Sequence, residues 1–259
     1  MERLIALGRC LFAAAVIALG VENIVCAHSR EVVIPALPWL PPNPALAFLT
    51  GIALIAAGLC IAINFNVRLA AVFLGIFLLL CLLILRVPVP VAQPFDLSIR
   101  TTVFEILSLC AAALTLARSL PQDRADFQHR KGPFELFLRS GRYLFAISSV
   151  VFGISHFLAA SSIATLIPAW IPARLFWAYF TGAAFVAAGL GIATSLLERL
   201  AATLLGLMFM LWFLIVHLPQ VLSAPRAHNP NEWSSAFIAL GMCGASWILA
   251  QDGMRGRQG

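Results

Sequence analysis

Two stretches of this chain read almost alike: FLTGIALIAAGLCI, from Phe48 to Ile61, and FWAYFTGAAFVAAGLGI, from Phe176 to Ile192. Each contains a Thr-Gly pair, then apolar residues, then Ala-Ala-Gly-Leu. The glycines of these two motifs are seven residues apart in both stretches, a spacing that returns to nearly the same face of an α-helix. Each stretch therefore predicts a helix with a seam of small residues, along which another helix can approach closely.

The likeness continues on both sides of these stretches. With an offset of 133 residues, GRCLFA at 8–13 aligns with GRYLFA at 141–146. After a two-residue difference in a loop, Thr-Gly and Arg-Leu-Ala-Ala align as well, at 50–51 with 181–182 and at 68–71 with 199–202. The register holds over four apolar segments, so the sequence predicts a tandem duplication. We expect a first four-helix repeat at 1–117, a cytoplasmic linker at 118–140 and a second four-helix repeat at 141–259.

The composition predicts a protein that lies in a lipid bilayer. Of the 259 residues, 61% are hydrophobic and only 11% are charged, against about 25% charged in an ordinary soluble domain. Eight apolar runs are near the length of roughly 20 residues that crosses a bilayer as a helix. They are Leu4–Ala27, Ala45–Ile63, Arg68–Leu85, Thr101–Ala117, Tyr143–Ala159, Leu175–Thr194, Leu200–Leu218 and Trp233–Ala250. The predicted fold is an all-α integral membrane protein, with eight transmembrane helices in two tandem four-helix bundles.

The distribution of positive charge predicts the orientation. Each repeat has an even number of spans, so both repeats enter the bilayer from the same side and form a parallel repeat. Twelve Lys and Arg residues fall on the side of the chain termini and five on the other, which places both termini in the cytoplasm. The net charge of +6 accompanies no nucleic-acid-binding motif, so the expected partner is lipid and not nucleic acid.

Polar residues within the spans are the candidate site, because such groups are costly in hydrocarbon and usually face a partner or a cavity. All of them fall toward the predicted outer face. They are Glu22, Asn23, Arg86, Arg100 and Glu105 in the first repeat, and His156 and His217 in the second. The charged residues fit either a structural ion-pair network or a site for a lipid headgroup or anion; they are Glu22, Arg86, Arg100 and Glu105. The histidines fit a cavity or proton path; they lack the local spacing of a metal motif, so neither haem nor a metal site is expected.

Several of these residues carry a resemblance to a known family. The matching features are the arginine that opens the first helix (Arg9, Arg142), the glycine and later polar position near its end (Gly20 with Asn23, Gly153 with His156), the Thr-Gly and Gly-Leu second helix, and the Arg-Leu-Ala-Ala start of the third. The unit resembles the four-helix DoxX-like membrane family, which includes the DoxD-type subunit of thiosulfate:quinone oxidoreductase. Many of those proteins carry a glutamate three residues after the second-helix glycine, where this chain has Leu54 and Phe185.

The resemblance implies a bacterial inner-membrane protein linked to redox or sulfur metabolism. The first functional hypothesis is a membrane subunit of a quinone-linked oxidoreductase, with quinone or substrate held by the outer-facing polar residues. The alternative is a non-enzymatic binder or carrier of a small lipophilic molecule or anion. A structural partner for another membrane or redox subunit is the third reading. The sequence leaves open whether the protein is an enzyme and assigns no catalytic residue.

Overall fold

The computed structural model describes residues 2–27, 43–86, 97–120, 132–223 and 231–255, and the regular structure in these ranges is helical. Eight membrane spans, all long and apolar enough to cross a bilayer, confirm the predicted multi-pass membrane protein. The helices that supply them are α1 (Glu2–Val25), α2 (Pro44–Ala62), α3 (Val67–Cys81), α5 (Leu97–Ser119), α6 (Pro133–Leu158), α8 (Arg174–Ala193), α9 (Glu198–Trp212) and α11 (Asn231–Arg255). The short helix α10 (Leu218–Ser223) ends the span that α9 begins, and a second short helix, α7 (Ala160–Leu166), follows α6 outside the spans.

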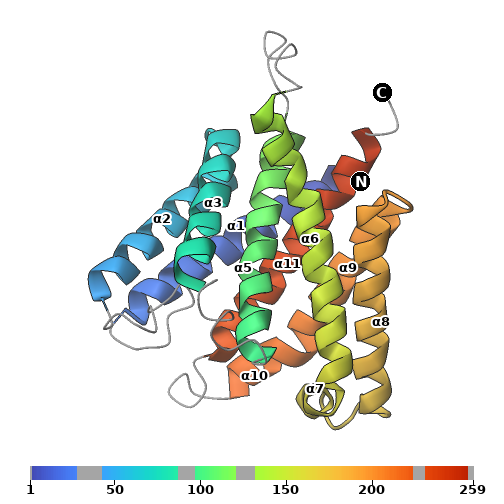
Figure 1. Ribbon diagram of the computed structural model, residues 1–259. Helices are drawn as coiled ribbons and strands as arrows, with labels where there is room; N and C mark the ends of the chain where they lie inside the picture. Colours follow the sequence, from blue (N-terminus) through green and yellow to red (C-terminus); the bar gives the residue numbers. More distant parts are fainter. Residues whose placement is uncertain (1, 28–42, 87–96, 121–131, 224–230, 256–259) are drawn as a thin grey trace.

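The spans pack as two lobes around a central pair of helices (Figure 1). We call α1, α2 and α3 the N-terminal lobe, and α6, α8 and α9 the C-terminal lobe. Helices α5 and α11 pack against each other between the lobes. Helix α1 packs mainly against α2 and α11, whereas α6 packs mainly against α8 and α5. The first helix of each half of the chain therefore contacts the last helix of the other half.

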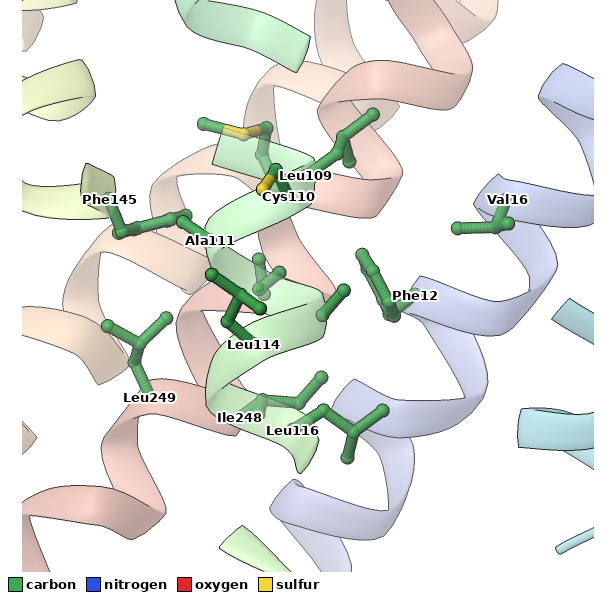
Figure 2. Packing of buried hydrophobic residues seen from close by; sticks show 14 of the residues in the cluster. Phe12, Val16, Leu109, Cys110, Ala111, Leu114, Leu116, Phe145, Ile248 and Leu249 are labelled. Atoms are coloured by element: carbon green, nitrogen blue, oxygen red, sulfur yellow. The ribbon is translucent and has the colours of Figure 1, made fainter. Parts of the chain in front are cut away.

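The centre of the molecule is an apolar core that both lobes share. Phe12 of α1 and Phe145 of α6 point from opposite sides toward α5 (Figure 2), and neither ring is exposed. The α5 residues of this region include both large and small side chains: Leu114 is completely buried, and so are Ala111, Ala112 and Ala113. Small side chains let helices approach closely where apolar lipid provides no hydrophobic drive for association. Helix α5 thus packs against α3 of one lobe and α6 of the other, and its alanines allow a close approach.

Glycines form the contact between the first two helices of each lobe. A Cβ atom added to Gly20 of α1 would lie 2.7 Å from the carbonyl oxygen of Gly51 of α2. A Cβ atom added to Gly153 of α6 would lie 2.6 Å from the carbonyl oxygen of Gly182 of α8. The backbones are therefore in direct contact at both places, as the seam of small residues in the sequence predicts.

The turns that follow the second helix of each lobe also share a backbone conformation. Asn64 and Asn66 have φ angles of 62° and 42° in the turn between α2 and α3. Ser195 and Leu197 have φ angles of 60° and 56° in the turn between α8 and α9. Positive φ is uncommon outside glycine, although asparagine tolerates it better than leucine. The sequence alignment of the two halves pairs these same positions.

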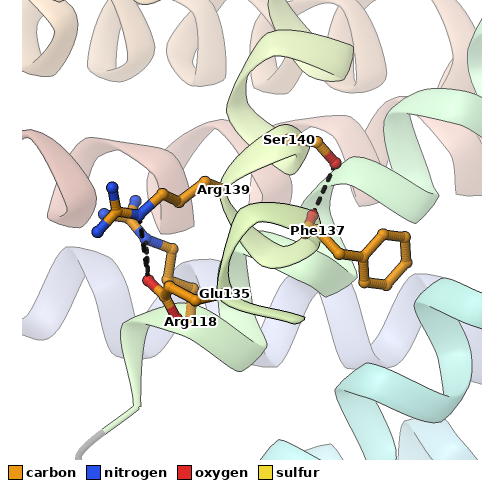
Figure 3. A network of polar contacts seen from close by, with 5 residues as sticks. All are labelled: Arg118, Glu135, Phe137, Arg139 and Ser140. Atoms are coloured by element: carbon orange, nitrogen blue, oxygen red, sulfur yellow. Dashed lines mark hydrogen bonds and ion pairs between the residues drawn. The ribbon is translucent and has the colours of Figure 1, made fainter. Parts of the chain in front are cut away.

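The α5–α6 junction lies within the predicted linker 118–140, whose residues 121–131 are outside the described ranges. Helix α6 begins at Pro133, a proline in the first turn, where the missing N–H leaves no bond unmade. Glu135 in that turn lies 3.4 Å from the Nε atoms of both Arg118 and Arg139 (Figure 3). The start of α11 lies at the opposite end of the bundle from this junction, whereas the start of α1 and the end of α11 lie near it (Figure 1).

Candidate binding sites in the two lobes

The predicted site residues lie on several helices toward the end of the bundle away from the start of α1 (Figure 1). Glu22 and Asn23 are in the last turns of α1, and Glu105 lies half-buried on α5. His156 is in the last turn of α6. Their three helices, α1, α5 and α6, belong to the two lobes and to the central pair. Arg86 ends a helical turn after α3 and Arg100 lies in the first turn of α5, but both side chains are outside the described part of the chain.

Glu22 connects the two halves of the chain. Its side chain is only 2% exposed, and its Oε1 accepts a 2.9 Å hydrogen bond from the hydroxyl of Ser234 on α11. A buried carboxylate needs such donors, because its desolvation is otherwise costly. Ser234 was not among the predicted site residues. Its role depends on the contact between α1 and α11, which alignment of one half with the other does not indicate.

Asn23 faces the interior of the N-terminal lobe and has no exposed surface. Its Nδ2 donates to the hydroxyl of Thr50, 3.3 Å away. That hydroxyl has a single hydrogen, which is shared with the carbonyl oxygens of Leu46 and Ala47 at 2.9 and 3.0 Å, so it can only accept from Asn23. The orientation of the amide is thereby fixed. Its Oδ1 is left without a hydrogen-bond donor among the described residues.

His156 occupies the corresponding position in the C-terminal lobe. Its Nδ1 lies 2.8 Å from the carbonyl oxygen of Phe152, and because a carbonyl can only accept, Nδ1 carries the hydrogen. The neutral imidazole then presents Nε2 as an acceptor. The ring packs 5.1 Å from that of Phe185, which also contacts Phe152 at 5.9 Å and Phe209 at 5.3 Å. The acceptor atom Nε2 therefore belongs to a ring that packs against aromatic side chains.

The two lobes carry polar residues at equivalent positions, but the contacts of these residues and the side chains around them differ. The sequence alignment pairs Asn23 with His156 and Thr50 with Thr181, and the hydroxyl of Thr181 also donates to its own helix, at Trp177 and Ala178. Where the C-terminal lobe has Phe152, Phe185 and Phe209, the N-terminal lobe has Leu19, Leu54 and Leu78, all buried. The threonines belong to the repeated Thr-Gly motif, whose small residues predict a close helix contact.

Both lobes contain a π-helical turn after their third helix. These turns are η1 (Leu82–Arg86) and η3 (Phe213–His217), and they end on two of the predicted site residues. Single π-helical turns are rare and often occur at functional sites, because the extra residue redirects the side chains that follow. Nδ1 of His217 is buried and has no hydrogen-bond partner within the described ranges. Hydropathy does not distinguish such a turn from the helix around it.

The structure does not bring the two histidines together. Within the described residues, no hydrogen bond or ring contact joins His156 to His217. The same part of the chain also contains no group of three or more His, Cys, Asp or Glu side chains that could hold a metal ion. The described cysteines are all free thiols.

Comparison with known proteins gives one partial match to a family model and no function. Residues 145–244 match a family model described as "Domain of unknown function (DUF8561)". This segment runs from α6 into α11 and includes both His156 and His217. No curated protein and no solved structure matches the chain. The comparisons do not assign the chain to the DoxX-like family, so that resemblance stays a prediction from the sequence motifs.

Proposed function

We propose that the chain is a tandem duplication of a four-helix unit, with both termini in the cytoplasm of a bacterial inner membrane. The recurring features support the duplication: equivalent glycine contacts, equivalent turns with positive φ and equivalent π-helical turns. The excess of Lys and Arg on the side of the termini supports the orientation.

Reporter fusions to the two ends test this topology. A reporter active only in the cytoplasm is expected to work at both ends, because eight spans return the chain to the side on which it started. A fusion pair that reports opposite sides of the membrane would refute the arrangement.

The function that we propose is binding of a small lipophilic ligand, and for the C-terminal lobe that ligand is a quinol. The observation that carries the proposal is the acceptor of His156 beside the ring of Phe185. A quinol is a flat aromatic ring with hydroxyl donors at its edge. Aromatic rings prefer offset-stacked or edge-to-face contacts with other rings, and Nε2 of His156 would accept the hydroxyl hydrogen.

Replacing His156 tests the quinol site. His156→Phe keeps a ring against Phe185 but removes the acceptor, so the affinity for a short-chain benzoquinol should fall about tenfold, the effect of one lost hydrogen bond. His156→Asn introduces the residue of the other lobe and should retain more of the affinity. Binding can be measured under reducing conditions by the quenching of tryptophan fluorescence in mild detergent.

A control variant and an extraction experiment accompany this test. Ile154→Ala, at a side chain that is 47% exposed on the same helix, should leave binding unchanged. Equal affinity of the wild-type protein and His156→Phe would contradict the proposal. Extraction of the purified protein with organic solvent, followed by mass spectrometry, should also recover quinone.

The predicted quinone-linked oxidoreductase and the non-enzymatic carrier would both use this site. The two functions differ in whether the bound quinol is oxidised. If the protein belongs to an oxidoreductase, membranes that contain it and its partner subunits should oxidise added quinol in a His156-dependent manner when an electron-accepting dye is supplied, so that the dye takes up the two electrons and the two protons are released. Binding without any such oxidation would favour the carrier of a small lipophilic molecule.

A further inference from the structure

Two arginines occupy equivalent positions at the end of the bundle that contains the chain termini. Arg9 lies on α1 and Arg142 on α6, and the sequence alignment of the two halves pairs them. Each reaches the region of the turn that follows the second helix of its lobe: Arg9 bonds to Asn64, and Arg142 pairs with Glu198 at the start of α9. Their surroundings nevertheless differ in charge.

Arg142 has a carboxylate partner. Its Nη1 lies 3.6 Å from Oε2 of Glu198, a side chain that is only 6% exposed. Its Nη2 donates to the hydroxyl of Tyr143 at 2.9 Å, and its guanidinium lies 4.6 Å from the centre of the same ring. The charge of Arg142 is therefore compensated within the protein.

Arg9 has no such partner in the described part of the chain. Its Nη1 donates to the amide oxygen of Asn64 at 3.0 Å, and its Nε is buried and without a hydrogen-bond partner there. The residues that correspond to Glu198 and Tyr143 are Val67 and Cys10, neither of which can compensate a positive charge. Within the described residues, the half-buried guanidinium of Arg9 thus has one neutral hydrogen-bond acceptor, the amide oxygen of Asn64.

We propose that Arg9 binds the phosphate of an anionic phospholipid. The guanidinium prefers an anion with two oxygens in its plane, which a phosphodiester supplies. The position suits a lipid, because the turn at Asn64 is exposed and the neighbouring Phe65 and Leu69 are 59% and 70% exposed. The headgroup phosphate would lie at Arg9, and the acyl chains would cover these apolar side chains. A Lys or Arg near a membrane surface attracts anionic lipid by the same electrostatics.

The test compares lipids on the purified, delipidated full chain. We expect phosphatidylglycerol to bind more tightly than phosphatidylcholine, as measured by native mass spectrometry and by the shift in thermal unfolding. Arg9→Gln should weaken phosphatidylglycerol binding about tenfold, the effect of one lost charge-assisted hydrogen bond. Arg3→Gln, which removes an exposed arginine of the same helix, should leave it unchanged.

A second variant tests the charge argument directly. Val67→Glu places a carboxylate where Glu198 stands in the other lobe, so it should occupy Arg9 and also weaken phosphatidylglycerol binding. Should this variant not fold, Arg9→Gln decides alone. Equal binding of phosphatidylglycerol by the wild-type protein and Arg9→Gln would overturn the proposal. An equal, Arg9-dependent stabilisation by inorganic phosphate would instead identify a site for free anions and overturn the lipid assignment.

Discussion

Gly153→Ala should destabilise the protein by about 2 to 3 kcal/mol, the cost of overpacking a tightly packed contact. The new Cβ would lie 2.6 Å from the carbonyl oxygen of Gly182 and 3.0 Å from the backbone nitrogen of Val186. Backbone atoms cannot rotate out of the way as a side chain can, so α6 and α8 would have to separate. Chemical denaturation in a mild detergent, followed by circular dichroism, measures the change in the free energy of unfolding.

Gly191→Ala is the matched control for this prediction. Gly191 lies on α8, and a Cβ there would meet its nearest atoms at 3.2 Å, a contact that a shift of a few tenths of an ångström relieves. Alanine also raises helix propensity by up to about 1 kcal/mol at both positions, so the difference between the variants isolates the helix contact. A Gly153→Ala protein as stable as Gly191→Ala would show that the two backbones are not in contact.

Arg142→Leu should destabilise the protein by about 1 to 3 kcal/mol, because it removes one partner of a largely buried ion pair and leaves the carboxylate with less compensation. Glu198 is only 6% exposed and lies 3.6 Å from the guanidinium. Replacing both residues with leucine should recover most of the loss, since the buried carboxylate is then removed as well. The same denaturation experiment measures both variants.

Arg139→Leu provides the comparison with an exposed pair. Arg139 lies 3.4 Å from Glu135 (Figure 3), but its side chain is 53% exposed. Exposed ion pairs of this kind contribute about 0 to 1 kcal/mol. If Arg142→Leu and Arg139→Leu had the same small effect, the pair between α6 and α9 would not stabilise the bundle.

The individual spans were predictable from the sequence, whereas their neighbours were not. Hydropathy over about 20 residues locates a helix because the hydrocarbon layer sets its length. It does not choose which helix packs against which. The last helices of the two halves, α5 and α11, share the motif positions Phe104 and Cys110 with Phe237 and Cys243. Either could pack against α1 on those grounds, and only the structure shows that α11 does so.

The candidate site was predictable to a similar degree. Glu22, Asn23 and His156 were identified because polar side chains in a membrane span require partners. The partners themselves depend on tertiary contacts: Ser234 lies on a distant helix, and Thr50 belongs to a motif that packing alone could explain. The π-helical turns that end on Arg86 and His217 could not be predicted either, because their first four residues are as apolar as the helices before them.

The contact between α1 and α11 has a consequence for biosynthesis. Glu22 and its hydrogen-bond partner Ser234 are 212 residues apart. At ribosomal rates of about 5–20 residues per second, Ser234 is therefore synthesised roughly 10 to 40 s after Glu22. During this interval the newly inserted first helix exposes the flank that α11 later covers. The nascent chain therefore completes this buried contact only after its last span has been synthesised.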